Sequence, residues 1–234
     1  MKKSLLAIAA LSTIAGAAQA QSSVTLFGAL DAGGYFANQV QPKTTAVPAS
    51  PAWGVLANTI VSSNWGLKGS EDLGGGLKAN FYAESGINPR NGSLSQAGGE
   101  VGTTSNGTAA GTTTTTLFDR GLYVGVEGKW GKLDLGNKLN PFFASHGGLM
   151  PVSGNSVATN AASAQGYFLP FVHNSITYTM PTMAGFNAAV QYGTGNQIND
   201  SNSGSALSGA ADYTIGGFNV RAGGQYLASK GTPL

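Results

Sequence analysis

From Ser23 onward, apolar and polar residues alternate along this chain with a period of two, in segments separated by glycine-rich breaks. The segment 77–84 is the clearest case. Its two alternating sets are Leu77, Ala79, Phe81 and Ala83 on one side, and Lys78, Asn80, Tyr82 and Glu84 on the other. Successive side chains of a strand point to opposite faces, so this pattern predicts a strand between an apolar medium and a wet one.

The same alternation predicts nine strands and no competing helix. They comprise a segment that begins at Ser23, one around Trp65, and the ranges 77–84, 121–129, 131–139, 173–180, 185–193, 207–215 and 218–227. Such repeated short strands with turn signals between them indicate an all-β fold.

The predicted connections are alternately short and long. The short ones are 71–76, 130–131, 181–185 and 216–217, and the long ones are about 38–60, 87–117, 140–172 and 194–206. Consecutive antiparallel strands place all the long connections at one end, as in transmembrane barrels with tight periplasmic turns and long external loops. A soluble sandwich has no reason for this asymmetry. The pattern therefore favours an antiparallel transmembrane β-barrel.

The composition agrees with a barrel in lipid. The chain has 36 glycines and no cysteine, and only 9% of its residues are charged. A soluble globular domain carries about a quarter charged residues. The formal charge of +2 includes Lys2 and Lys3, and no basic patch points to nucleic acid.

Residues 1–20 have the pattern of a secretory signal peptide. Lys2 and Lys3 form a charged start, the run from Leu5 to Ala17 is small and apolar, and Ala18-Gln19-Ala20 supplies a cleavage pattern. The run is too short to span a membrane. We expect export and cleavage after Ala20, which leaves residues 21–234 to form the barrel.

Several segments resemble the general porins typical of β-proteobacteria. The most specific is residues 65–79, Trp-Gly-Leu-Lys-Gly-Ser-Glu-Asp-Leu-Gly-Gly-Gly-Leu-Lys-Ala, which resembles the second strand, first turn and third strand of that family. Further resemblances lie at 23–33, 123–126, 133–137, 174–178 and 184–186. Together these segments extend over essentially the whole mature chain.

The resemblance implies a sixteen-stranded barrel in the outer membrane of a Gram-negative bacterium, surrounded by lipid and assembled as a homotrimer. It implies passive diffusion of small hydrophilic solutes and ions, with no cofactor and no catalysis. Nine strands are predicted here, whereas sixteen would need on the order of 370 residues. We therefore expect residues 21–234 to be the N-terminal part of a barrel that is incomplete at its C-terminal end.

The sequence departs from the family at the narrowing of the pore. There the resemblance implies arginines on the wall opposite carboxylates on the third external loop, here about 140–172. The corresponding wall positions hold Asn64, Asn137 and Phe171, and the loop contains no Asp or Glu. Since fixed charges set the selectivity of a pore, we expect a weakly selective channel.

Two groups of residues are candidates for the pore. The expected pore-lining residues are Asp31, Asn64, Lys68, Lys78, Glu84, Lys132, Asp134, Asn137, Lys138 and Arg221. The expected constriction-loop residues are Phe142, Phe143, His146, Tyr167, Phe168 and Phe171. Basic residues slightly outweigh acidic ones in the first group, which favours anions.

Three alternatives remain open at this point. A secreted β-rich adhesin or binding domain would share the export signal and the strand pattern. A solute-specific channel could use the loop aromatics as a sliding surface for sugars. A barrel hydrolase would need a catalytic triad, but the two histidines, His146 and His173, have no Gly-x-Ser-x-Gly elbow, and no acid lies in the loop of His146. Two histidines without cysteine also make a poor zinc site, so we expect no enzyme and no metal.

Overall fold

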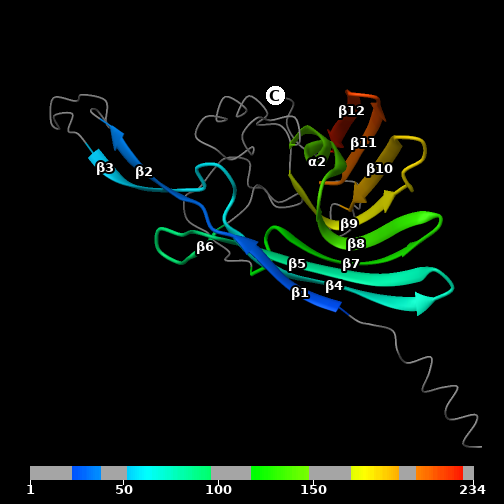
Figure 1. The fold of residues 1–234 in the computed structure, drawn as a ribbon, viewed down its shortest axis with the longest axis horizontal. Helices are drawn as coiled ribbons and strands as arrows, with labels where there is room; N and C mark the ends of the chain where they lie inside the picture. The colour runs from blue at the N-terminus through cyan, green and yellow to red at the C-terminus, as the bar shows by residue number, and fades with distance from the viewer. Residues whose placement is uncertain (1–22, 38–51, 96–116, 148–169, 195–203, 229–234) are drawn as a thin grey trace, which may run out of the picture.

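The computed structural model describes residues 23–37, 52–95, 117–147, 170–194 and 204–228. Nine antiparallel strands form one curved sheet, and each strand pairs with the next one along its path (Figure 1). In order they are β1 (Ser23–Ala29), β4 (Asn64–Gly74), β5 (Leu77–Ile87), β7 (Gly121–Gly128), β8 (Gly131–Leu139), β9 (Phe171–Thr179), β10 (Phe186–Gly193), β11 (Ala206–Ile215) and β12 (Phe218–Leu227). A short strand, β6 (Leu94–Ser95), also pairs with β5. The all-β prediction and the predicted strands are confirmed.

The tight turns lie together at one end of the sheet (Figure 1). Between β4 and β5 the chain passes through Gly74, Gly75 and Gly76, whose φ angles are +81°, +63° and +82°. Residues with a Cβ rarely adopt this left-handed conformation, so the glycine run is what makes this turn possible. The Asp72 carboxylate accepts a hydrogen bond of 2.8 Å from the Gly74 amide and closes the turn.

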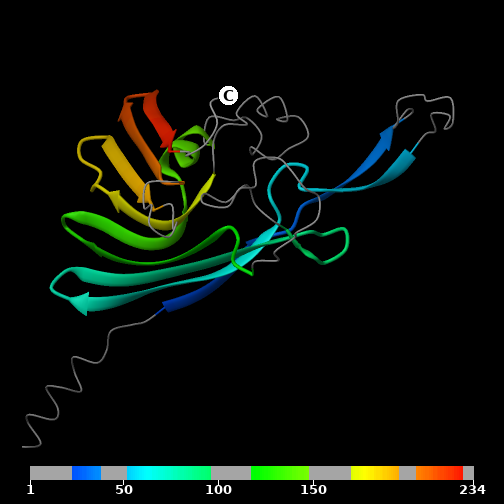
Figure 2. The same cartoon turned by 180° about the vertical axis from the view of Figure 1, so that it is seen from behind.

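The two faces of the sheet reverse the usual arrangement of a soluble protein. On the concave face, Asp134, Thr177 and Gln191 are each only 1% exposed. On the convex face, apolar side chains are exposed along every strand, and in β7 these include Leu122, at 50%, and Val124, at 59%. Figure 2 shows the sheet from behind. Because exposing so many large apolar side chains to water is unfavourable, the convex face suits an apolar medium.

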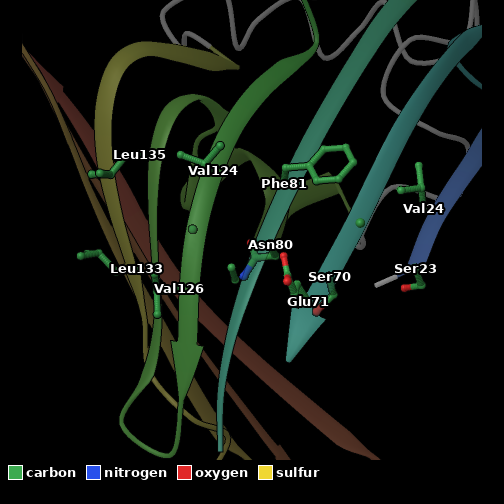
Figure 3. Close-up of a pocket in the computed structure, with 13 residues that line it drawn as sticks. Ser23, Val24, Ser70, Glu71, Asn80, Phe81, Val124, Val126, Leu133 and Leu135 are labelled. Atoms are coloured by element: carbon green, nitrogen blue, oxygen red, sulfur yellow. The ribbon is translucent and has the colours of Figure 1, made fainter. Parts of the chain in front are cut away.

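A groove on the convex face shows this character at close range (Figure 3). Its labelled apolar side chains are Val24, Phe81, Val124, Val126, Leu133 and Leu135. They come from β1, β5, β7 and β8, and Glu71 of β4 lies at one end. The Phe81 ring covers Gly69 of β4, where an added Cβ would lie 2.9 Å from the ring atom Cζ.

The first predicted strand is interrupted after Ala29, which differs from the expected continuous alternation. Asp31 accepts hydrogen bonds from the Thr59 hydroxyl (2.5 Å), the Val61 amide (2.7 Å) and the Ile60 amide. These bonds hold a bend, which alternation cannot reveal because it depends on residues 28 to 30 positions away.

Beyond this bend the chain forms a separate hairpin, whose second strand lies within the region 38–60 that was expected as a long loop. Strands β2 (Ala32–Ala37) and β3 (Ala52–Ala57) pair with each other and project away from the main sheet (Figure 1). The hairpin is apolar on one face, where Phe36 and Trp53 lie opposite each other and are 68% and 84% exposed.

A helix, α2 (Pro141–Gly147), begins in the expected constriction loop and lies inside the curve of the sheet (Figure 1). Asn140 caps it, because its side-chain oxygen accepts a 2.7 Å hydrogen bond from the Phe143 amide, and Pro141 occupies the first helical position. The helix packs against β11 and β12. In the part of the chain that the structure describes, no helix is long and apolar enough to cross a membrane.

The Asp31 bend predicts a specific effect of acid on the hairpin. Hydrogen bonds from Thr59, Ile60 and Val61, that of the Thr59 hydroxyl above all, lower the pKa of Asp31. Stability from a lowered carboxyl pKa is present above its ordinary range and lost as the pH falls through the folded value. We expect amide exchange at Ile60 and Val61 to be constant between neutral pH and about pH 4, after correction for intrinsic rates, and to rise only in stronger acid.

The Asp31→Ala variant should show severalfold faster exchange at Ile60 and Val61 already at neutral pH. Asp72→Ala, which removes the cap of the distant β4–β5 turn, should leave these two amides unchanged. Equal protection in wild type and Asp31→Ala would contradict the assigned role.

Candidate functional site: the charged wall of the concave face

Three aromatic rings form a ladder across the concave face. Phe27 of β1 lies 5.3 Å from Tyr82 of β5, and Tyr82 stacks on Tyr123 of β7 at 5.0 Å, measured between ring centroids. Tyr82 and Tyr123 lie directly opposite each other on neighbouring strands, and their spacing is close to the distance between such strands. Phe27 and Tyr82 lie on strands separated by β4, and the Phe27 ring reaches Tyr82 across Gly66 of that strand. The rings fit because glycine lies beside them: a Cβ on Gly66 would approach the Phe27 Cζ atom to 2.6 Å, and one on Gly121 would lie 3.1 Å from Tyr82.

Lysines cover both ends of this ladder. The Lys68 ammonium lies 5.4 Å from the centroid of Phe27, and those of Lys132 and Lys138 lie 5.5 and 5.1 Å from that of Tyr123. Cations are attracted to aromatic ring faces at these distances. The ladder therefore fixes the positions of three positive charges on the wall.

Asp134 lies between two of these lysines and is almost completely buried. Its carboxylate contacts the ammonium of Lys132 at 3.4 Å and also that of Lys138, which lies four residues further along β8. Gly125 on β7 leaves the space that the carboxylate occupies. Two cations thus share one acid, and this cluster carries a net positive charge.

A second ion pair joins the beginning of β7 to β5. The Arg120 Nε atom donates to Glu84 at 2.6 Å, and the Tyr82 hydroxyl donates to the other carboxylate oxygen of Glu84 at 2.5 Å. The Arg120 guanidinium also lies 5.8 Å from the Phe171 ring centroid. The sequence singled out Glu84 and Phe171 but missed Arg120, because it directly precedes the predicted strand and takes no part in its alternation.

A third group ties α2 to the wall. Ser145 donates its hydroxyl to Asp212 at 2.8 Å, and Arg221 donates to the Ser145 carbonyl at 2.6 Å. Arg221 and Asp212 form an ion pair of 3.3 Å between β12 and β11. Sequence reasoning named Arg221 but missed Asp212. The two-residue turn at 216–217 could have revealed it, since strands paired symmetrically about this turn place 212 opposite 221.

Other expected pore residues lie nearer the ends of the strands. Asn64 begins β4 and donates to the Ser62 carbonyl at 3.0 Å, while Lys78 lies beside the β4–β5 turn opposite Asp72. Asn137 lies opposite Leu122 of the convex face, and its amide donates to the carbonyls of Phe118 and Asp119. Asp31 holds the bend described above.

The expected constriction-loop residues are only partly described. Phe142 and Phe143 lie in α2, where an added Cβ on Gly223 of β12 would be 3.0 Å from the Phe142 ring. Phe171 is buried at the start of β9. Tyr167, Phe168 and the side chain of His146 lie outside the described residues. Within those that are described, no three His, Cys, Asp or Glu residues are grouped so as to hold a metal.

The close packing of the aromatic ladder predicts that a larger residue at Gly66 lowers the stability of the fold. Gly66→Ala would force a methyl group against Phe27 and the Ala83 carbonyl, and we expect it to lower the free energy of unfolding by about 1–3 kcal/mol. The matched control is Gly224→Ala on β12, where an added Cβ meets no atom within 4 Å. Urea unfolding in detergent, followed by tyrosine fluorescence, measures both variants. Equal stabilities would contradict the packing role of Gly66.

The model of the family described as Gram-negative porin matches residues 7–232 of this chain. An outer membrane porin protein of Bordetella pertussis is 34% identical over 203 residues, which cover 82% of this chain and 48% of that protein. Outer membrane porin protein 32 of Delftia acidovorans is 34% identical over 202 residues, covering 82% of this chain and 49% of the relative.

A solved structure, an anion-selective porin from Comamonas acidovorans, has the same fold. Its TM-score is 0.63 at 24% identity, and the match covers 89% of this chain and 59% of the other. The chain thus spans about half the length of these two curated relatives. The family match extends over nearly all of its own residues, so the resemblance found in the sequence is confirmed. This chain belongs to the Gram-negative porins, a family of outer-membrane β-barrel proteins.

Proposed function

We propose that this chain forms the wall of a water-filled channel through which small hydrophilic solutes and ions diffuse passively across the outer membrane. The observation that carries the proposal is the reversed polarity of the sheet: buried ion pairs on the concave face and exposed apolar side chains on the convex face. In a transmembrane barrel the strands alternate in this way between lipid and an aqueous interior.

The proposed channel is weakly selective, with a slight preference for anions. The concave side carries both basic and acidic side chains, which include Lys68, Lys78, Arg120, Lys132, Lys138 and Arg221 on the one hand and Asp72, Glu84, Glu127, Asp134 and Asp212 on the other. Most of these charges are neutralised by a neighbour, and the Lys132–Asp134–Lys138 cluster leaves one positive charge in excess. Fixed charges near the path bias its ion flow.

The proposed partners are outer-membrane lipid, on the convex face, and two further copies of the chain in a homotrimer. The convex groove between β1 and β8 supplies an apolar surface for such contacts. We propose transport without catalysis, since the relatives above are named as porins. Hydrolytic activity that disappears in His146→Ala would contradict this.

The proposal is tested by current across a planar lipid bilayer with residues 21–234 refolded in detergent. We expect stable conductance steps that a scrambled-sequence control lacks, and a reversal potential in a KCl gradient close to zero with a small displacement toward the chloride potential. A bilayer that incorporates the chain without steps would contradict a channel formed by these strands alone, and a strong cation preference would contradict the proposed selectivity.

The lysines around Asp134 should set the residual preference. The double variant Lys132→Gln/Lys138→Gln removes two fixed positive charges and leaves Asp134 unpaired, so the anion-to-cation permeability ratio should fall on the order of twofold or more. Lys78→Gln is the control, because Lys78 lies opposite two acids, Asp72 and Glu127, near the turn. A ratio that moves equally in both variants would contradict a special role for the Asp134 cluster.

A further inference from the structure

A polar pocket of about 350 Å³ lies between α2 and the concave face. Its walls come from β8 to β12 on one side and from α2 on the other, and none of its polar side chains faces the convex side. The polar side chains that matter here are Lys138, Ser145, Thr177, Asn187, Asp212 and Arg221. Pockets for small molecules begin at about this volume, so only a small solute fits.

Thr177 gives this pocket an unsatisfied polar group. It lies in the middle of β9 and is 1% exposed, and its hydroxyl has no hydrogen-bond partner. Buried polar groups in proteins are nearly always hydrogen-bonded, and an unpaired one costs about 1–3 kcal/mol. Thr177 lines the pocket, and the two residues paired with it on β8 and β10, Asp134 and Gln191, each carry an unbonded buried oxygen as well. A water or solute hydroxyl held at this part of the pocket would supply a hydrogen-bond partner.

The charges around the pocket are already paired with one another. Lys138 binds Asp134, and Arg221 binds Asp212. An ionic solute gains little from a neutralised partner, and taking that partner over would leave the other charge unpaired in a poorly hydrated place. Paired ions nevertheless keep free donor and acceptor capacity, because an ammonium has three protons and a carboxylate accepts several hydrogen bonds.

A neutral solute with several hydroxyl groups uses this capacity without separating any ion pair. Its hydroxyls accept from Lys138 and Arg221, donate to Asp212, and exchange a hydrogen bond with Thr177. We propose that this pocket is a binding site on the wall of the channel for small, neutral, polyhydroxylated solutes of the size of a four- or five-carbon polyol. This inference rests on the proposed function and adds to it a class of solute and the site at which that solute binds.

The test uses the folded chain in detergent and xylitol as the probe, with binding measured by saturation-transfer NMR and titration. We expect a dissociation constant near the millimolar range, since only a few hydrogen bonds form in a wet site. Thr177→Val, which keeps the shape but removes the hydroxyl, should weaken binding roughly three- to tenfold. Thr177→Ser should restore it, and xylonate, the carboxylate of matching size, should bind more weakly than xylitol.

The matched control is Thr25→Val, which removes an exposed threonine on β1, at the far side of the same face. It should bind xylitol as the wild type does. Equal affinities of Thr177→Val and wild type, or tighter binding of xylonate than of xylitol, would overturn the proposal. Xylitol binding can be measured in a chain that passes no current. Binding that depends on Thr177 without any conductance would support the pocket and contradict the channel. Conductance without xylitol binding would support the channel and contradict the pocket.

Discussion

Each of the nine strands of the main sheet hydrogen-bonds its backbone to its neighbours, so the sheet is continuous from β1 to β12. A membrane offers no partner for free backbone groups, and this pairing is what permits the chain to expose apolar side chains on one face. Everything else follows from the pairing and its register. A slip of one residue in any strand would exchange its apolar and polar sides. The ion pairs and the ladder therefore depend on the same register as the convex face.

Little of the packing is that of a hydrophobic core. Among the described residues, the buried hydrophobic side chains are only Ala83, Phe171, Val172, Ala206 and Ala210. On the concave face, aromatic rings pack over glycine residues instead, and lysine ammonium groups lie against these rings. The β11–β12 hairpin then holds α2 through Asp212 and Arg221. The concave face is therefore a polar wall built from ion pairs and aromatic rings, as the proposed channel requires.

The sequence predicted what depends on local alternation and failed where distant residues act. The strands around 121–139 and 207–227 were predicted within about two residues, because each is a hairpin whose two faces differ in polarity over its whole length. The bend at Asp31 was missed because its partners lie near Thr59, and α2 was missed because a seven-residue helix is too short to show a period. Lys138 and Arg221 were found from their position opposite apolar neighbours. Arg120 lies outside any strand, and Ser145 is placed by the tertiary fold alone.

The central claim is that the concave face meets water while the convex face meets lipid. The chain contains no cysteine, so single cysteines can be introduced along β7 and β8 and tested in liposomes with a charged, water-soluble maleimide. Glu127→Cys and Lys132→Cys should react rapidly, whereas Val124→Cys, Val126→Cys and Leu133→Cys should be protected. A fluorophore attached at these last three sites in detergent should be quenched by a lipid-borne quencher after transfer to liposomes. Equal reactivity at all five positions, or protection of Glu127→Cys and Lys132→Cys, would contradict the account.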